Sequence, residues 1–561
     1  MMAGTTKGRS GTKGCRFVFP KPDRAVNPTM AVVEEKPPAQ PVPPPEAAQY
    51  PSLAKVVLIM IALYASVFLI FLDKLIVTAA IPRITDEFNS LGDIGWYGSA
   101  FMLTAAASQL VYGRIYTFYP AKWVLLASIT LFEIGSAVCG AAPSSTALIG
   151  GRAIAGLGTG GIASGTMVII VLLLPLRLRP IFQSLNGGIF GVASVLGPVL
   201  GGVFTTRLTW RWCFYINLPF GGAALTAIFF LLNTPPPRNG GMGIKEQFLL
   251  LDPLGNLALI PSVTSLLLAL EWGGSTYPWS SWRILLLFIL SAVLFGIFIF
   301  AEIWNQEKAL IPPRIFKQRS VLAGTLWTTC MSASMTVMLY YLPLWFQVIR
   351  NTNAEISGIM ILPFVLSMVV TVISCGFLVA ILGYYNPFMY ASTILMSVAV
   401  GLLSTLQPTT PSPKWIGYQV LFGIGLGMGF MQANVAVQTC LDRADVPVGA
   451  SLMMFTNQLS GAVFLAIAET LFSNILDASL RDMPGWDGSV ASSGASNIRN
   501  IFSGDQLTEA VQAYSGAIVK TFLLALGVAC LSVVGAVMME WKSVKKAKEG
   551  AAAARAGGEG R

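Results

Sequence analysis

About fourteen apolar runs, each roughly 20 residues long, recur between Lys55 and Trp541 and are separated by short polar links. A helix of about 20 residues rises roughly 30 Å, which is the thickness of the hydrocarbon core of a bilayer. The runs are too long and too continuously apolar for barrel strands, in which apolar and polar residues alternate. The sequence therefore predicts an all-α polytopic membrane protein with 14 transmembrane helices.

The composition and the charges fit that expectation. The chain is 54% hydrophobic and 11% charged, whereas soluble domains are about 25% charged. Outside the spans, 25 of the 36 Lys and Arg residues fall on one side and 9 on the other, and Lys74 and Arg152 complete the total. Because positive residues stay in the cytoplasm, both termini are expected there. The expected location is the cell membrane, with the vacuolar membrane as the alternative.

The sequence lacks the residues that several classes of function require. The chain contains no histidine, and its seven cysteines form no C-x-x-C pair, so we expect no metal site and no Ser-His catalytic group. No G-x-x-x-x-G-K-[ST] phosphate loop occurs. We expect no cofactor, no nucleic-acid partner and no enzymatic activity. The energy for transport should come from an ion gradient, and the chain should act as a monomer in the bilayer.

Two similar turns suggest a repeat. The second span ends in GRIYTFYPAKW and the tenth in GFLVAILGYYNPF, and repeated bundles are typical of transporters. If these turns correspond, spans 1–6 match spans 9–14. The expected organisation is a disordered cytoplasmic tail (1–52), a six-helix bundle (53–235), two inserted helices (236–306), a basic cytoplasmic connection (307–319), a second six-helix bundle (320–541) with an extracellular loop (474–514), and a disordered cytoplasmic tail (542–561).

Asp73 and Arg152 are opposite charges inside apolar spans, and such residues normally face a cavity or a partner. If the first span ends near Pro82 and the fourth begins near Thr146, they lie roughly 13 Å and 10 Å below the same surface. Our hypothesis is that they are coupled across a water-accessible cleft, where the carboxylate binds a proton in one conformation and releases it in the other. A static structural ion pair is the alternative.

The fifth span, GGIFGVASVLGPVLGGVF, is rich in small residues and contains a proline. Small residues let another helix approach closely in lipid, and proline bends a helix. This pattern suggests a hinge against which two bundles rock, or simply tight packing. The residues singled out are Gly191, Gly197, Pro198, Gly201 and Gly202.

Other polar residues occur within the spans. Glu469 stands alone in GAVFLAIAETLF and is the second candidate for proton binding. Five amides could line a substrate cavity or bond one helix to another: Gln109, Gln432, Asn434, Asn457 and Gln458.

Residues 50–542 resemble the major facilitator superfamily, in particular its fourteen-span drug:proton antiporters and fungal toxin and multidrug efflux pumps. The similar segments are LDKLIVTAAIPRITDEF followed by DIGWYGSAFMLT, then GRAIAGLGTGG, and GPVLGGVFTTRLTWRWCFYINLPFG. The resemblance implies two six-helix bundles plus two extra spans, alternating access to a central cavity, proton antiport, and amphipathic or aromatic substrates. It places the acidic residue of the first motif at Asp73 and the arginine of the second at Arg152.

One motif departs from the family pattern, because Thr117 and Phe118 replace the charged pair of the loop between spans 2 and 3. The leading interpretation is a proton-coupled exporter of toxins, secondary metabolites or drugs. The alternatives are an importer of a siderophore or nutrient, and a transport-inactive sensor on the same fold.

Overall fold

A computed structural model describes residues 52–90, 93–234, 243–274, 276–352, 354–481, 483, 502 and 504–545. The two expected tails lie outside these residues, except for Ser52 and for Lys542 to Lys545. Much of the expected loop 474–514 also lies outside them.

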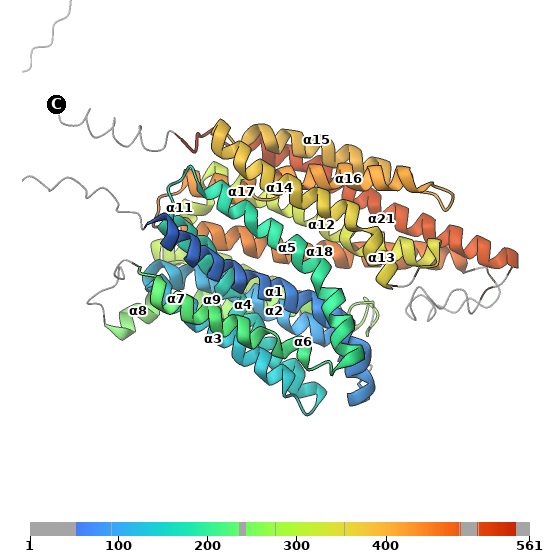
Figure 1. Cartoon of the computed structure of the whole chain (residues 1–561), viewed down its shortest axis with the longest axis horizontal. Helices are drawn as coiled ribbons and strands as arrows, with labels where there is room; N and C mark the ends of the chain where they lie inside the picture. Colours follow the sequence, from blue (N-terminus) through green and yellow to red (C-terminus); the bar gives the residue numbers. More distant parts are fainter. Residues whose placement is uncertain are drawn as a thin grey trace, which may run out of the picture. The chain divides into compact units, whose positions relative to one another are not determined.

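Within the described chain, 13 helices are long and apolar enough to cross a membrane. The 25-residue α2 runs alongside α4 and α18 and completes fourteen spans. We call the side where α1 begins and α21 ends the tail side, and the opposite side the loop side (Figure 1). The first bundle contains α1 (Leu53–Phe88), α2 (Ile94–Phe118), α3 (Ala121–Gly140), α4 (Ser145–Leu173), α5 (Arg179–Arg207), and α6 (Trp212–Tyr215) continued by α7 (Asn217–Leu231).

Two spanning helices are inserted between the bundles: α9 (Pro253–Trp272) and α10 (Trp282–Asn305), preceded by the short α8 (Ile244–Leu250) and followed by α11 (Pro313–Phe316). The second bundle contains α12 (Arg319–Arg350), α14 (Leu362–Leu382), α15 (Asn386–Leu403), α16 (Ser412–Gly429) continued by α17 (Gln432–Cys440), α18 (Val446–Leu480) and α21 (Gly504–Met538); the short α13 (Ala354–Met360) precedes α14. The predicted fold class, two six-helix bundles plus two inserted helices, is confirmed.

Small residues set the spacing of the first bundle. A Cβ at Gly135 of α3 would collide with the backbone of Ala155 on α4, and one at Gly158 of α4 with the backbone of Phe132 on α3. Dispersion between closely packed helices replaces the hydrophobic effect as the driving force within lipid. This packing holds α3 and α4 in a fixed register, which positions the charge on α4.

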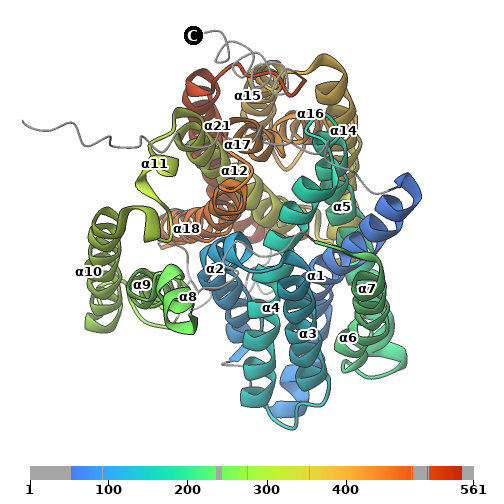
Figure 2. The same cartoon turned by 90° about the vertical axis from the view of Figure 1, so that its left-hand side faces the viewer.

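The two bundles touch along two seams, α5 against α14 and α2 against α18 (Figure 2). On the tail side both seams are tight. A Cβ at Gly113 of α2 would meet Ser451 of α18, and one at Gly376 of α14 would meet Ser184 of α5. The structure therefore describes a conformation in which the bundles meet on the tail side.

The inserted helices are anchored by buried carboxylates. Asp252 accepts hydrogen bonds from Asn305 at 2.8 Å and from the backbone of Leu310 at 3.1 Å. Glu302 accepts from the backbone of Leu310 at 3.0 Å and of Ile311 at 2.8 Å. These bonds satisfy buried backbone donors. They fix the connection to α12 against both inserted helices.

Candidate functional site

Asp73 and Arg152 form an ion pair in the core of the first bundle. Asp73 lies near the middle of α1, Arg152 lies on α4, and Arg152 Nη1 donates to Asp73 Oδ2. Their exposed fractions are 0% and 1%. The structure thus brings together the two charges that the sequence placed at similar depth.

The Arg152 guanidinium is held by more than this carboxylate. Its Nε donates to the backbone oxygen of Tyr97 on α2 at 2.8 Å. Its carbon lies 4.3 Å from the ring centroid of Phe101 and 6.0 Å from that of Phe214. Arginine favours such sites because its planar group both stacks on rings and donates in fixed directions. Three helices therefore fix the guanidinium in one position.

Asn217 is a third member of the site that the sequence analysis missed. Its Nδ2 lies 3.1 Å from Asp73 Oδ1 and 3.1 Å from the hydroxyl of Ser136 on α3. Asn217 is fully buried at the start of α7. The only signal in the sequence is an amide two residues before Pro219, near the start of the sixth apolar run. Each oxygen of the Asp73 carboxylate thus has a donor of its own.

This geometry corrects one part of the hypothesis, because the pair does not border a water-accessible cleft in this conformation. Both side chains are buried, and Phe101 and Phe214 cover the guanidinium. Glu133 of α3 lies near Asp73 and packs against Gly221 of α7. Neither Glu133 carboxylate oxygen accepts a hydrogen bond from the residues that the structure describes. The cluster is therefore closed to water in the conformation described.

Replacing Asn217 with leucine should weaken transport more than it weakens the fold. The change removes one hydrogen bond to the buried Asp73 carboxylate, and a bond to a charged group contributes about 1.5–3 kcal/mol. We expect the transport rate to fall roughly tenfold or more, since 1.4 kcal/mol is a factor of about ten. Asn256→Leu, which alters an amide of the inserted α9, is the control. Equal transport rates for Asn217→Leu and the unmodified protein would show that Asn217 takes no part in transport.

The small residues of α5 face two different neighbours. Cβ atoms at Gly197 and Gly201 would meet Leu75 and Ala79 of α1, within the same bundle. A Cβ at Gly191 would instead meet the side chain of Val369 on α14, in the other bundle.

Pro198 lies inside α5, and no described atom comes within 4 Å of a Cβ placed at Gly202. Of the five residues predicted for a hinge, Gly191 is therefore the one placed at the seam between the bundles.

Glu469 is not part of the buried cluster. It lies on α18 of the second bundle with an exposed side chain. Its carboxylate is close enough to that of Glu271 on α9 for the two charges to repel. Glu271 packs against Gly95 of α2. The acidic pair therefore lies where an inserted helix meets both bundles. The sequence offered no sign that the two glutamates meet.

Gln109 is at the contact between the bundles. Its Nε2 donates to the Ser164 hydroxyl on α4 at 2.7 Å and lies 3.6 Å from the sulfur of Met454 on α18. The Ser164 hydroxyl is in turn 3.1 Å from that of Ser451 on α18. This amide bridges helices rather than lining a cavity in the conformation described.

The other four amides lie in the second bundle. Gln432 donates to the backbone of Met428 at 2.9 Å, while Gln432 Oε1 and Asn434 Oδ1 are buried without a partner among the described residues. Asn457 and Gln458 are half-buried on α18. Unsatisfied buried oxygens are costly unless a water or ligand reaches them. Gln432 and Asn434 thus retain free acceptors for a ligand.

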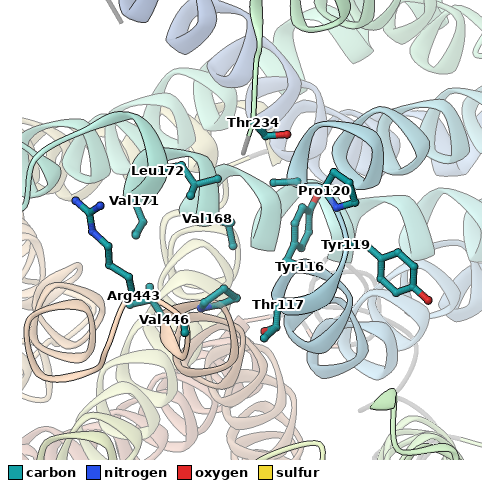
Figure 3. A pocket seen from close by; sticks show the side chains of 13 residues that line it. Tyr116, Thr117, Tyr119, Pro120, Val168, Val171, Leu172, Thr234, Arg443 and Val446 are labelled. Carbon is teal, nitrogen blue, oxygen red and sulfur yellow. The ribbon is translucent and has the colours of Figure 1, made fainter. Parts of the chain in front are cut away.

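A small cavity of about 280 Å³ lies on the tail side. Figure 3 shows Tyr116 and Thr117 at the end of α2 on one side, and Arg443 of the α17–α18 link and Val446 at the start of α18 on the other. Thr117 is one of the residues that replace the family's charged pair. The α2 side of this cavity therefore presents hydroxyl and aromatic groups, and Arg443 is the charged side chain on the opposite wall.

Comparison with known proteins gives a consistent picture. Residues 63–465 match the family described as Major Facilitator Superfamily. The chain is 49% identical to the MFS-type transporter VdtG of Byssochlamys spectabilis, over 89% of this chain and 90% of that protein. It is 44% identical to the rubrofusarin-specific efflux pump aurT of Gibberella zeae, over 89% and 92%. A double Trp mutant of XylE shares the fold, with a TM-score of 0.57 at 12% identity, over 88% of this chain and 98% of that one.

Proposed function

This chain belongs to the major facilitator superfamily, and we propose that it exports small amphipathic organic compounds by alternating access in exchange for protons. The substrate would be a toxin, a secondary metabolite or a drug. The names of similar proteins support export, since they include an efflux pump specific for rubrofusarin and the efflux pumps aunC and roqT.

The observation that carries the proton-coupling part is the buried pair Asp73–Arg152. A proton arriving on Asp73 cancels the ion pair and leaves a buried guanidinium without its counter-charge. Breaking a buried pair in this way costs about 3–5 kcal/mol. That cost can be relieved if α4 moves relative to α1 and the guanidinium gains a new partner or water. Protonation of one side chain would thereby favour a second conformation of the bundles.

Four further features are proposed with it: the sidedness, the membrane, the oligomeric state and the conformational state. The tail side is cytoplasmic, which follows from the excess of Lys and Arg on that side. The location is the plasma membrane, and the protein works as a monomer because each chain holds both bundles. The bundles meet on the tail side in the structure, so we assign this conformation to the state closed to the cytoplasm.

Proteoliposomes provide the test of function. The purified protein is reconstituted, a pH gradient is imposed, and a panel of fluorescent amphipathic aromatics is followed together with internal pH. A proton-coupled exporter moves protons only with substrate, in the opposite direction. Movement in the same direction as protons would indicate an importer, and the absence of both fluxes across the panel would indicate a transport-inactive protein.

A further inference from the structure

A large cavity opens on the tail side, between the α4–α5 link, the tail-side end of α14 and the α17–α18 link. Its volume is about 880 Å³. It is separate from the Asp73–Arg152 cluster, which lies buried inside the first bundle. Because both bundles and the segment after α21 contribute to its wall, the cavity sits at the seam that must part when the tail side opens.

The charges of this cavity are strongly one-sided. Four cations line it, and Asp442 is the one carboxylate among the described lining residues. The four cations are Arg177, Arg179, Arg443 and Lys545. A concave surface with charges of one sign raises the local concentration of oppositely charged small molecules. The cavity therefore favours an anion.

Two of its polar side chains are built into the wall rather than lying on the surface. Arg179 is 3% exposed and is positioned by its bonds to the backbone oxygens of Leu174 at 3.2 Å and Val171 at 3.0 Å. Gln438 is 4% exposed, and neither its amide nitrogen nor its oxygen has a hydrogen-bond partner within the described chain. A buried amide with both groups unsatisfied is costly, and a bound polar group would relieve that cost.

The rim of the cavity is apolar. Leu178, Phe377 and Ile381 line it and are 36%, 47% and 61% exposed. Exposed aliphatic and aromatic groups beside a cluster of cations match a molecule that has a hydrocarbon body and an acidic group. A purely ionic ligand would gain nothing from this rim, and a neutral apolar one would gain nothing from the arginines.

A further cation, Lys74, lies on α1 further inside the membrane. Phe71, one turn before Lys74 on the same face of α1, packs edge-on against Phe190 of α5 with a centroid distance of 5.3 Å. Phe190 packs in turn against the core of the second bundle. Lys74 is half-buried, and no described residue forms an ion pair or hydrogen bond with it. An ammonium group within a span normally has a counter-charge, and an anionic ligand would supply one.

We propose that the exported compounds are amphipathic organic anions whose acidic group enters at the cavity of Arg177, Arg179, Gln438 and Arg443, with Lys74 as the next cation along the seam. This inference rests on the proposed export function and on the assignment of the tail side to the cytoplasm. It adds the chemical class of the substrate and the place where the substrate enters.

The test compares two probes that differ only in charge, 1-pyrenebutyric acid and 1-pyrenebutanol, on the full-length protein in nanodiscs of phosphatidylcholine. The variant Arg177→Gln/Arg443→Gln changes two exposed side chains and should fold normally. We expect it to raise the apparent Kd of the acid about tenfold, which corresponds to about 1.4 kcal/mol, because the acid loses two nearby cations that stay partly screened by water. Its Kd for the alcohol should stay within about twofold. Lys74→Gln should also weaken binding of the acid and leave binding of the alcohol unchanged.

Lys317→Gln is the matched control, since Lys317 is an exposed cation on the same side that does not line the cavity. The proposal would be overturned if Lys317→Gln lost as much affinity for the acid as the double variant does. Equal affinity of the unmodified protein for the acid and the alcohol would also overturn it. A second arm replaces part of the lipid with phosphatidylserine. If that lipid abolishes the preference for the acid, a lipid headgroup occupies the cavity and the proposal is wrong. Proton-coupled transport of the alcohol with no preference for the acid would leave the export function standing while removing this inference.

Discussion

Replacing Arg152 with alanine is expected to abolish proton-driven efflux while leaving a protein that still assembles in the membrane. The substitution leaves the Asp73 carboxylate buried, and its second donor, Asn217, cannot compensate for a full charge. Removing one partner of a buried pair costs about 3–5 kcal/mol. We therefore expect a lower unfolding temperature as well as transport at the background of empty liposomes.

A double variant separates stability from coupling. Asp73→Asn/Arg152→Gln removes both charges and keeps polar groups of similar size, so most of the lost stability should return. Proton flux should not return, because the carboxyl that is proposed to carry the proton is gone. Arg211→Ala is the control, since it breaks the half-exposed pair with Glu87 and should cost only about 0–1 kcal/mol. Normal proton-driven efflux by Arg152→Ala would contradict the proposed role of the pair.

The second large effect is expected at Gly191 of α5. Replacement by valine would drive a branched side chain into Val369 of α14 across the seam. Overpacking of this kind costs about 1–3 kcal/mol, and here the cost falls only on conformations in which the two helices touch. We expect the efflux rate to fall roughly tenfold, because a shift of 1.4 kcal/mol changes a conformational ratio about tenfold. The unfolding temperature should change little, since the packing inside each bundle is untouched.

Two other glycines of the same helix serve as matched controls. Gly202→Val enters open space and should leave efflux unchanged. Gly201→Val would press on Ile76 and Ala79 of α1, so it should lower the unfolding temperature instead. Efflux and melting are measured on all three purified variants. If Gly191→Val transports like Gly202→Val, the α5–α14 seam does not take part in the conformational change.

Much of the charged site could be anticipated from the chain alone. Span length and the rise per residue place Asp73 and Arg152 at matching depth, and the cost of isolated charges in lipid leaves a partner as the common solution. The rotation of one helix about its axis, however, is not contained in its own sequence. Asn217 joins the site only because α7 turns its first residue toward α1, and Glu271 meets Glu469 only because α9 packs beside α18.

The predicted hinge in α5 shows the same division between what the sequence indicates and what the packing of the helices decides. Counting small residues identified α5 as a helix of close approach, since residues without large side chains permit such contacts in any bundle. Which of its glycines lies at the seam depends on the neighbouring helices. Gly197 and Gly201 pack against α1, and Gly191 packs against α14. Spacing of three and four residues cannot separate these partners, because one helix can present small residues to two neighbours at once.

The sequence by itself determined the fold class, the family pattern and the similar depth of the buried acid and base, and it predicted the sidedness of the charges. These follow from local properties, namely hydrophobic length, loop composition and rise per residue. Only the tertiary structure decided that the acid and base touch and are sealed from water, that α5 serves two neighbours, and that cations from both bundles surround one cavity. The reason is physical: contacts between helices depend on how each is rotated and shifted against the others, and that arrangement minimises the energy of the whole bundle rather than of any single segment.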